Sequence, residues 1–438
     1  MGKFPGLSEK IQDYSVVTLL VLTPLARGST PRWAFCLTLL LALLAFTAMF
    51  LKRLWTDKRV LPRTPLDWFW LVALAIAFAS LIGSLYREAT YWALARLALY
   101  LGVFYLAFEA ARYRRRARLY VWTIISLGAA LSFIGLIKYM GAPLPSFWIY
   151  GLPGQEKMIT ATYMNHNHLA GYLEMSLSLG AGLLLFRAAR NPWVLGWLLA
   201  LMLFTLIWTM SRGGWIGLAA GLTVLTLLLC RKNKVRRLYV RLGLAALLAL
   251  VIVVFLGSGP VFERAVSMDD PREPSFLARL HVWSHSTELI RENPLLGTGL
   301  GAFPWAFTQV RPVGLALRYR EAHGDYVQIV VETGLLILIP IVWGGTRLYR
   351  LGVRRLDRTE SRFMAGLTAG ALGGVSALLV HSFGDFNLQL TANGLLFAVL
   401  LGLIVGPSRW KAEAGRKTGA APDDEPEFTV VKTPEVVF

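Results

Sequence analysis

Long apolar runs alternate with short polar segments along most of the chain. A membrane-spanning helix needs about 20 apolar residues, and runs of roughly this length occur at 13–27, 33–51, 66–85, 91–110, 119–140, 168–186, 193–210, 214–230, 238–257, 326–346, 363–382 and 390–406. The runs are continuous rather than alternating, which is typical of helices and not of barrel strands. The pattern predicts an all-α polytopic membrane protein with about twelve transmembrane helices.

Two longer polar segments interrupt this pattern. Residues 258–323 form a loop between the ninth and tenth predicted spans, and we expect short helices within it. Residues 407–438 are rich in Pro, Gly and carboxylates, and are too polar to bury a core, so we expect a disordered tail. Residues 1–406 are accordingly assigned to one integral membrane domain.

Composition agrees with this interpretation and explains the high charge. The chain is 55% hydrophobic and 16% charged, whereas a soluble domain is about 25% charged. The net charge of +19 would also fit a nucleic-acid-binding protein, but the basic residues lie between the apolar runs. Nucleic acid is therefore excluded as a partner.

The basic residues concentrate in alternate loops, which predicts the orientation of the chain. The loops are those holding Lys52, Arg53, Lys58, Arg59 and Arg63; Arg112, Arg114, Arg115, Arg116 and Arg118; Arg231, Lys232, Lys234, Arg236 and Arg237; and Arg347, Arg350, Arg354, Arg355, Arg358 and Arg362. Because Lys and Arg mark cytoplasmic loops, we expect an inner-membrane protein with both termini in the cytoplasm. The 258–323 loop is then periplasmic.

The predicted periplasmic loop contains arginine but no lysine. The arginines from Gly257 to Asp325 are Arg264, Arg272, Arg279, Arg291, Arg311, Arg318 and Arg320. A guanidinium presents a planar fork that binds phosphate oxygens in pairs, so this composition indicates a diphosphate ligand. The alternative is ordinary salt bridging at a solvated surface.

One of these arginines falls on an unexpected helix face. Residues 275–293 read as a helix that ends at Pro294, and His281, His285, Glu288 and Glu292 form its polar stripe. Arg279 lies on the opposite, apolar face, where a charge must meet an anion or a buried partner. His281 and His285 have the spacing of a zinc helix, but no glutamate lies between them, so we expect no metal site.

Other candidate residues lie at the same predicted membrane face. Arg212 and Gly213 occupy a tight outer turn, where glycine allows close approach and where an arginine can alternatively snorkel to the interface. His323 precedes a predicted span, and the positive helix end there opposes its protonation, as a general base requires; the alternative is an ordinary polar histidine. Asn165 and His168 open another span.

Three ionisable residues fall inside predicted spans. Glu174, Glu332 and Arg96 are functional candidates for that reason, with mutual pairing as the alternative. Arginines, a histidine and amides at one membrane face suit glycan transfer from a lipid diphosphate to a hydroxyl, because the leaving group needs charge stabilisation. No pair of carboxylates flanks an obvious cleft, so hydrolase chemistry is less well supported.

The order of motifs resembles a known family. The residues are Ser211-Arg212-Gly213-Gly214, Ala278-Arg279-Leu280 with Trp283, Asn293 to Gly301 with Phe303, His323-Gly324-Asp325-Tyr326-Val327-Gln328, and Glu332-Thr333-Gly334. From about Asn165 to Leu336 the chain resembles the bacterial O-antigen ligase and O-antigen polymerase family. Members often carry Asn after the histidine, where this chain has Gly324.

The resemblance implies a function and a set of site residues. It implies a metal-independent, inverting glycosyltransferase without a cofactor, whose donor is glycan linked to undecaprenyl diphosphate. Its catalytic residues correspond to His323, Arg212 and Arg279, and we assign substrate binding to Asn165, His168, Gly213, Arg311, Arg318 and Tyr326. The acceptor is lipid A-core in a ligase and a second lipid-linked glycan in a polymerase. A transporter of lipid-linked glycan is a further alternative, although no inverted repeat supports it.

Overall fold

The computed structural model describes residues 3–56, 61–149, 157–233, 276–311 and 319–407. All regular secondary structure in these ranges is helical, which confirms the all-α prediction. The predicted span at 238–257, and the tail after Pro407, lie outside the described residues.

The helices differ in length. The long ones are α1 (Lys3–Leu25), α2 (Arg32–Trp55), α4 (Arg87–Ala110), α5 (Arg114–Tyr139), α7 (His166–Leu185), α9 (Arg212–Asn233), α15 (Leu338–Arg358) and α16 (Arg362–His381). Shorter ones are α3 (Asp67–Ala79), α8 (Pro192–Trp208), α12 (Phe276–Glu292) and α17 (Thr391–Val405). The shortest are α6 (Ser146–Ile149), α13 (Phe303–Val310), α14 (Asp325–Thr333) and the 3₁₀ turns η1 (Arg27–Ser29), η2 (Leu335–Ile337) and η3 (Asn387–Gln389).

Many of these helices suit a bilayer. Within the described ranges, six are long and apolar enough to cross it, namely α2, α4, α5, α9, α16 and the continuous segment of η2 and α15. The apolar helices α3, α8 and α17 are shorter. The protein is thus a multi-pass membrane protein, while the exact number of about twelve spans is not confirmed.

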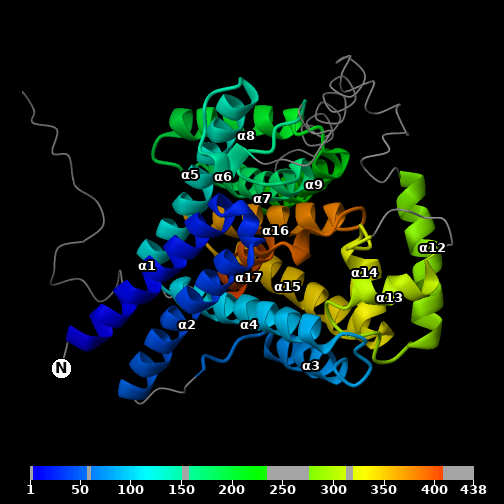
Figure 1. Ribbon diagram of the computed structural model, residues 1–438. Coiled ribbons are helices and arrows are strands. Elements are labelled where there is room, and N and C mark those ends of the chain that lie inside the picture. Colours follow the sequence, from blue (N-terminus) through cyan, green and yellow to red (C-terminus); the bar gives the residue numbers. More distant parts are fainter. Residues whose placement is uncertain (1–2, 57–60, 150–156, 234–275, 312–318, 408–438) are drawn as a thin grey trace, which may run out of the picture.

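Helix α16 lies at the centre of the bundle, with α7 and α9 along one side and α17 next to it (Figure 1). Small residues allow the helix backbones to approach closely, as is common in membranes. A Cβ on Gly182 of α7 would lie 2.4 Å from the Gly366 carbonyl oxygen of α16 and 2.6 Å from the Gly370 Cα. Helices α7 and α16 therefore pack against each other through glycine residues.

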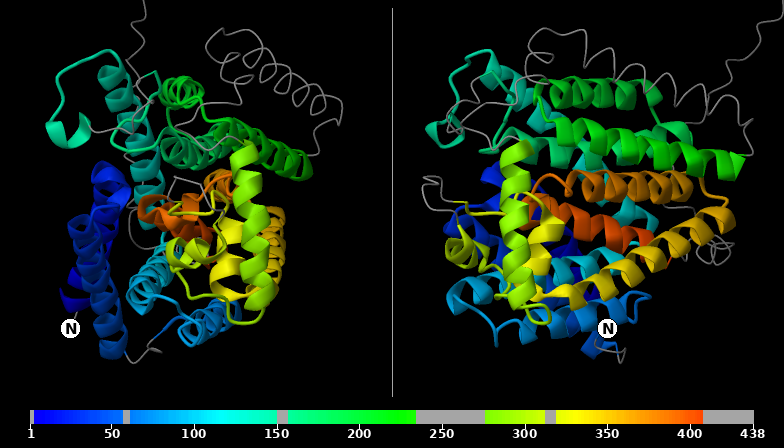
Figure 2. Two further views of the ribbon diagram at one scale, coloured as in Figure 1. Left: turned by 45° about the vertical axis from the view of Figure 1, so that its right-hand side comes forward. Right: turned by 90° about the vertical axis from the view of Figure 1, so that its right-hand side faces the viewer.

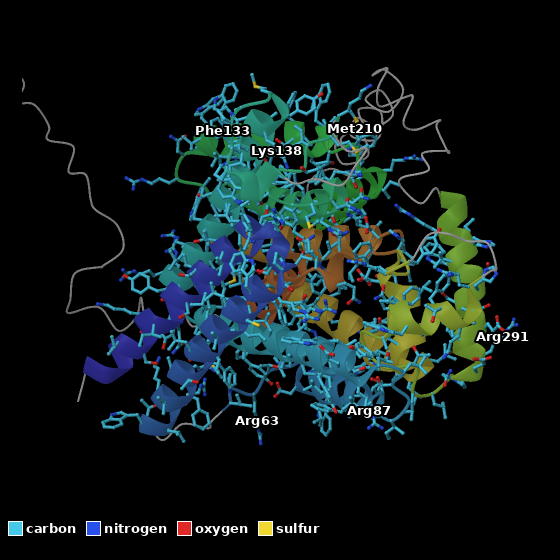
Figure 3. All side chains as sticks on the ribbon, viewed as in Figure 1. Arg63, Arg87, Phe133, Lys138, Met210 and Arg291 are labelled. Atoms are coloured by element: carbon cyan, nitrogen blue, oxygen red, sulfur yellow. The ribbon has the colours of Figure 1, made fainter. Side chains whose placement is uncertain are left out.

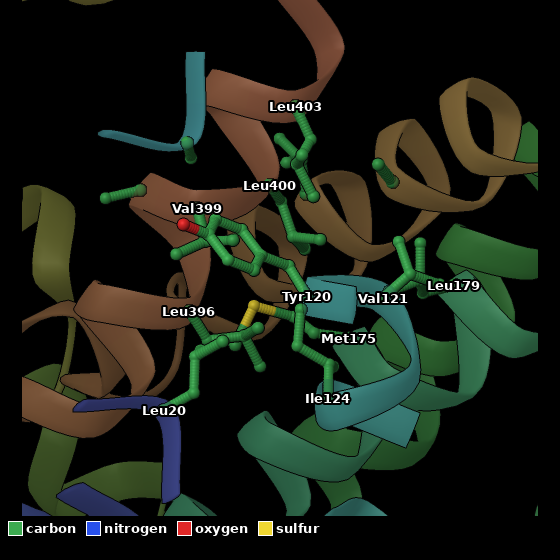
Figure 4. Packing of buried hydrophobic residues seen from close by; sticks show 14 of the residues in the cluster. Leu20, Tyr120, Val121, Ile124, Met175, Leu179, Leu396, Val399, Leu400 and Leu403 are labelled. Atoms are coloured by element: carbon green, nitrogen blue, oxygen red, sulfur yellow. The ribbon is translucent and has the colours of Figure 1, made fainter. Parts of the chain in front are cut away.

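The large apolar side chains fill the space beside this contact. Tyr120 of α5, Met175 of α7 and Leu400 of α17 are fully buried and come together from three helices (Figure 4). These contacts join the two halves of the chain, because residues from both belong to one continuous core. Packing in this core fixes the positions of α7, α16 and α17 relative to one another, and therefore the positions of their ends.

The predicted span at 326–346 is not one helix, which corrects the sequence-based prediction. Helix α14 ends at Thr333, and Gly334 adopts a φ of 78°, a conformation that other residues rarely adopt. The chain then turns, with the Leu335 N–H donating to the Pro294 carbonyl at 2.8 Å. The spanning helix begins at about Leu335, so α14 belongs with the segment before it.

Helix α12 stands at one side of the bundle and crosses the direction of the long helices (Figures 1 and 2). Its bounds match the predicted helix at 275–293. Val282 and Leu289 are fully buried and pack with Phe303 and Phe307 of α13, whereas Arg291 points away from the bundle (Figure 3). The described part of the 258–323 segment is thus a wall packed against the bundle.

The glycine contact between α7 and α16 leads to a prediction about the stability of the protein. Gly182→Ala should lower the free energy of unfolding by about 1–3 kcal/mol, because the added methyl group overlaps backbone atoms of α16. Thermal unfolding in detergent measures the effect. Gly196→Ala on α8 is the matched control, since nothing lies within 4 Å of its Cβ. Equal stability of the two variants would contradict this packing.

Candidate active site

The loop after α16 is the meeting point of the candidate residues. We name residues 382–390 the junction loop, because they join α16 to α17. The start of α7, the start of α14 and the side chain of Arg279 from α12 all contact it. Segments far apart in the sequence are therefore brought to one end of the bundle.

Asp325 ties α14 to the junction loop through both its backbone and its side chain. Its N–H donates to the carbonyl oxygens of Ser382 at 3.0 Å and Asp385 at 3.1 Å. Its Oδ2 accepts from the Ser382 hydroxyl at 2.7 Å and from the Leu388 N–H at 3.0 Å. Burial raises the pKa of Asp325 to about 7, although these two donors favour the charged form.

Arg279 and Trp283 hold the loop from the other side. Arg279 Nη1 donates to the Gly384 carbonyl, and Trp283 Nε1, one helical turn later, donates to the Ala322 carbonyl at 2.8 Å. Arg279 Nε is buried and has no hydrogen-bond partner among the described residues. Arg279 thus lies on the packed face, as predicted, and one of its five donors is unused by the described residues.

His323 sits between these contacts with a left-handed backbone. Its φ is 51°, a conformation that costs about 1–3 kcal/mol outside glycine and persists only when neighbours enforce it. Its half-buried ring lies 5.3 Å from the Phe386 ring, measured between centres. A Cβ at Gly324 would lie 3.1 Å from Trp283 Cζ2. The indole therefore occupies the space that an Asn would need there.

The Asp385 carboxylate is buried between two histidines. Its Oδ1 lies 3.9 Å from His168 Nε2, and its Oδ2 lies 3.9 Å from His381 Nε2. Burial alone would raise the pKa of Asp385, but His168 and the guanidinium of Arg279 outweigh it and lower this pKa. Asp385 is accordingly ionised at neutral pH.

A buried chain of polar groups connects Asp385 to the start of α9. His381 Nδ1 lies 3.2 Å from Glu174 Oε1, and a Cβ on Gly213 would lie 2.6 Å from His381 Nε2. The absence of a side chain at Gly213 therefore leaves room for the His381 imidazole. Arg212 precedes it as the first residue of α9, and its side chain is exposed. Glu174 is thus paired with His381, which agrees with the pairing alternative given for it from the sequence.

A cavity of about 560 Å³ adjoins the junction loop. His168 and Phe386 line it, and the rings of these two residues are 4.8 Å apart. The cavity is also lined by arginines and aromatic residues: Arg27, Arg32, Arg96, Arg320, Tyr86, Trp92 and Trp305. Phe386 thus separates His323 from a space that is both basic and aromatic.

Arg96 fixes the far end of the junction loop while lining this cavity. Its Nη1 and Nη2 donate to the backbone and side-chain oxygens of Gln389, each at 2.6 Å. Asn165, another lining residue, accepts from the Asn167 N–H at 2.7 Å and so caps α7. These residues combine a structural contact with a position at the cavity.

Two predicted substrate-binding residues, Tyr326 and Arg311, lie away from the cavity. Tyr326 donates its hydroxyl to the Leu379 carbonyl at 2.9 Å and so links α14 to α16. Arg311 is exposed at the end of α13, and neither residue lines the cavity. Arg318 lies outside the described residues.

His381 and Asp385 were not among the residues predicted from the sequence. The loop between the last two spans has no Lys or Arg, so charge counting passed over it. The sequence does contain a signal for them: in His381-Ser-Phe-Gly-Asp385, two ionisable residues stand at the end of an apolar run. Such groups at a membrane face are functional candidates.

One part of the chain matches a known protein family. Residues 197–342 match the model of the O-antigen ligase family. This segment is similar to the O-antigen ligase family. Among curated proteins, no significant match to the chain is found.

The matched segment contains Arg212, Arg279 and His323. His168 and Asp385 lie outside it, so the site is completed by other parts of the chain. The family consists of membrane glycosyltransferase-like enzymes that act on lipid-linked glycans and lipid acceptors. The match supports a ligase-like or polymerase-type function.

The hydrogen bonds between Asp325 and the junction loop lead to a prediction about stability. Asp325→Ala leaves the Ser382 hydroxyl and the Leu388 N–H without their acceptor, so the free energy of unfolding should fall by about 3 kcal/mol. Asp325→Asn keeps an acceptor oxygen and should cost less. Asp357→Ala is the control, because its ion pair with Arg231 is solvent-exposed and contributes less than about 1 kcal/mol. Thermal unfolding compares the three variants.

The lowered pKa of Asp385 predicts a dependence on pH. A carboxylate whose pKa is lower when folded stabilises the protein fully above about pH 4, its unfolded value. This contribution is lost as the pH falls through the folded pKa. The unfolding temperature of the native protein should therefore drop more steeply at acid pH than that of Asp385→Asn. Parallel pH profiles would contradict the lowered pKa.

Proposed function

We propose that this protein transfers a glycan from undecaprenyl diphosphate to a hydroxyl of lipid A-core at the periplasmic face of the inner membrane. The proposal rests most on one observation. Arg279 and Asp325 both bind the junction loop, and His323, two residues before Asp325, lies beside Phe386 at the edge of the cavity. A cation and a histidine thus lie at one end of the bundle, and Phe386 stands between the histidine and a substrate-sized space.

Arg279 and Arg212 are the groups we assign to the diphosphate. Arg279 uses one nitrogen to hold Gly384, and its Nε has no partner among the described residues. Arg212 stands at the start of α9, where the helix dipole also favours an anion. Guanidinium groups bind phosphate oxygens in pairs and stay charged at any working pH.

The reaction follows from these assignments. The acceptor oxygen attacks the anomeric carbon and forms the new glycosidic bond, while the bond from that carbon to the diphosphate oxygen breaks. His323 takes the proton of the acceptor hydroxyl. The bonding electrons leave with the diphosphate, whose increased charge the arginines stabilise.

The cavity supports a carbohydrate ligand. The Tyr86 and Trp305 rings stack with their centres 4.2 Å apart, and both line the cavity with Trp92. Aromatic faces bind the apolar faces of sugars, and the arginines and Glu321 there offer hydrogen bonds to hydroxyls. A basic and aromatic cavity suits a glycan better than an acyl chain.

A polymerase would use the same chemistry with a second lipid-linked glycan as acceptor. Reconstituted protein is supplied with lipid-linked glycan, either alone or with lipid A-core, and the products are separated by size. We expect glycan on lipid A-core. Products formed only between lipid-linked glycans would overturn the ligase assignment in favour of the polymerase.

The general-base role predicts a large rate effect at His323. His323→Ala should lower the turnover number by about 10²–10⁴-fold, and thermal unfolding checks that the variant is folded. His281→Ala is the control, because His281 is exposed on α12. Full turnover by folded His323→Ala would exclude the base and reopen the transport alternative.

The diphosphate role predicts a graded effect at Arg279. Arg279→Ala should reduce turnover by about 10²–10³-fold, and Arg279→Lys should restore part of it by returning the charge without the planar fork. Arg291→Ala, on the outer side of the same helix, should leave turnover unchanged (Figure 3). Equal losses at Arg279 and Arg291 would indicate a general effect of charge.

A further inference from the structure

A second cavity lies at the opposite ends of the same helices. It measures about 490 Å³ and is found where α5 and α16 begin and where α7 has just ended. Arg114 and Arg118 line it from α5, Arg187 from the segment after α7, and Arg362 from α16. We name it the arginine cavity.

The local sequence explains why these side chains converge. Arg114 and Arg118 are four residues apart and so share one face of α5. At the start of α16, the Ser361 hydroxyl accepts from the Met364 N–H, which fixes the first turn that carries Arg362. Arg187 adopts a φ of 53° as α7 ends. Three chain segments therefore place guanidinium groups at one point.

The charges in this cavity are unbalanced. Glu360 is the one carboxylate that lines it among the described residues, against four arginines. Arg114 Nε is buried and has no hydrogen-bond partner in the described part of the chain. The two helix starts add further positive potential. By contrast, Arg116 of the same helix is paired with Asp13 at 2.7 Å.

The position in the membrane identifies the class of anion. Both α5 and α16 are long and apolar enough to span a bilayer, so their first residues lie near its surface, at the level of lipid phosphates. Basic pockets between membrane helices bind phosphate headgroups, and arginine matches phosphate geometry. Arg118 is also held over the Phe363 ring, 5.3 Å from its centre, at the edge of the cavity.

We propose that the arginine cavity binds the phosphate headgroup of an anionic membrane phospholipid. This site lies at the end of α7 and α16 away from the junction loop, and it does not depend on the glycan-transfer proposal. The lipid neutralises the arginines and joins the starts of α5 and α16 to the end of α7.

The test measures lipid binding by full-length protein purified in neutral detergent. Phosphatidylglycerol is titrated, and binding is followed by native mass spectrometry and by the rise in unfolding temperature. Each basic residue near an anionic headgroup contributes about 1 kcal/mol. The apparent Kd should therefore rise roughly 30-fold in the double variant Arg114→Gln, Arg187→Gln, and about fivefold in Arg187→Gln alone.

A matched double variant separates the cavity from surface charge. Arg115→Gln with Arg190→Gln removes the same charge from exposed positions that do not line the cavity, and its Kd should be unchanged. Equal weakening in both double variants, or no weakening in Arg187→Gln, would overturn the proposal.

Two further ligands distinguish the source of the phosphate. Phosphatidylcholine, which is zwitterionic, should bind at least tenfold more weakly than phosphatidylglycerol. Inorganic phosphate at the same free concentration should not raise the unfolding temperature. If it does so and also displaces the lipid, the ligand is free phosphate and the assignment to a phospholipid is wrong.

Discussion

Asp325 lies at the first position of α14, where its backbone N–H and its carboxylate face the same loop. Together they make hydrogen bonds with Ser382, Asp385 and Leu388. The junction loop cannot shift relative to α14 without leaving buried polar groups unpaired, which costs more than an average hydrogen bond contributes. His323 and Phe386 are consequently held at a fixed separation, and the geometry of the site follows from this contact.

The neighbours of His323 explain how its unusual backbone conformation persists. Trp283 donates to the carbonyl of the preceding residue, and Gly324 leaves room for the indole on the other side. A helix outside the bundle core therefore enforces the orientation of a histidine beside the bundle. The 258–323 segment acts on the site through this contact, and not only through the arginine that it carries.

The sequence predicted features that depend on local periodicity. The bounds of α12 and the packed position of Arg279 follow from a helical repeat that can be counted along the chain. The break at Gly334 was missed, because an apolar run looks continuous whether or not one glycine adopts a positive φ. Asp385 was missed for another reason. Its importance comes from electrostatic interactions with His168 and Arg279, more than 100 positions away in the sequence.

Helix α16 shows that being apolar and facing lipid are separate properties. Its apolar stretch is 89% buried inside the protein, so its glycines face neighbouring helices and not acyl chains. Replacing them with leucine would make the segment more hydrophobic and would favour its insertion by the translocon. The same change would prevent assembly with α7. Such a chain would reach the membrane with the correct topology, and quality-control proteolysis rather than mistargeting would determine its abundance.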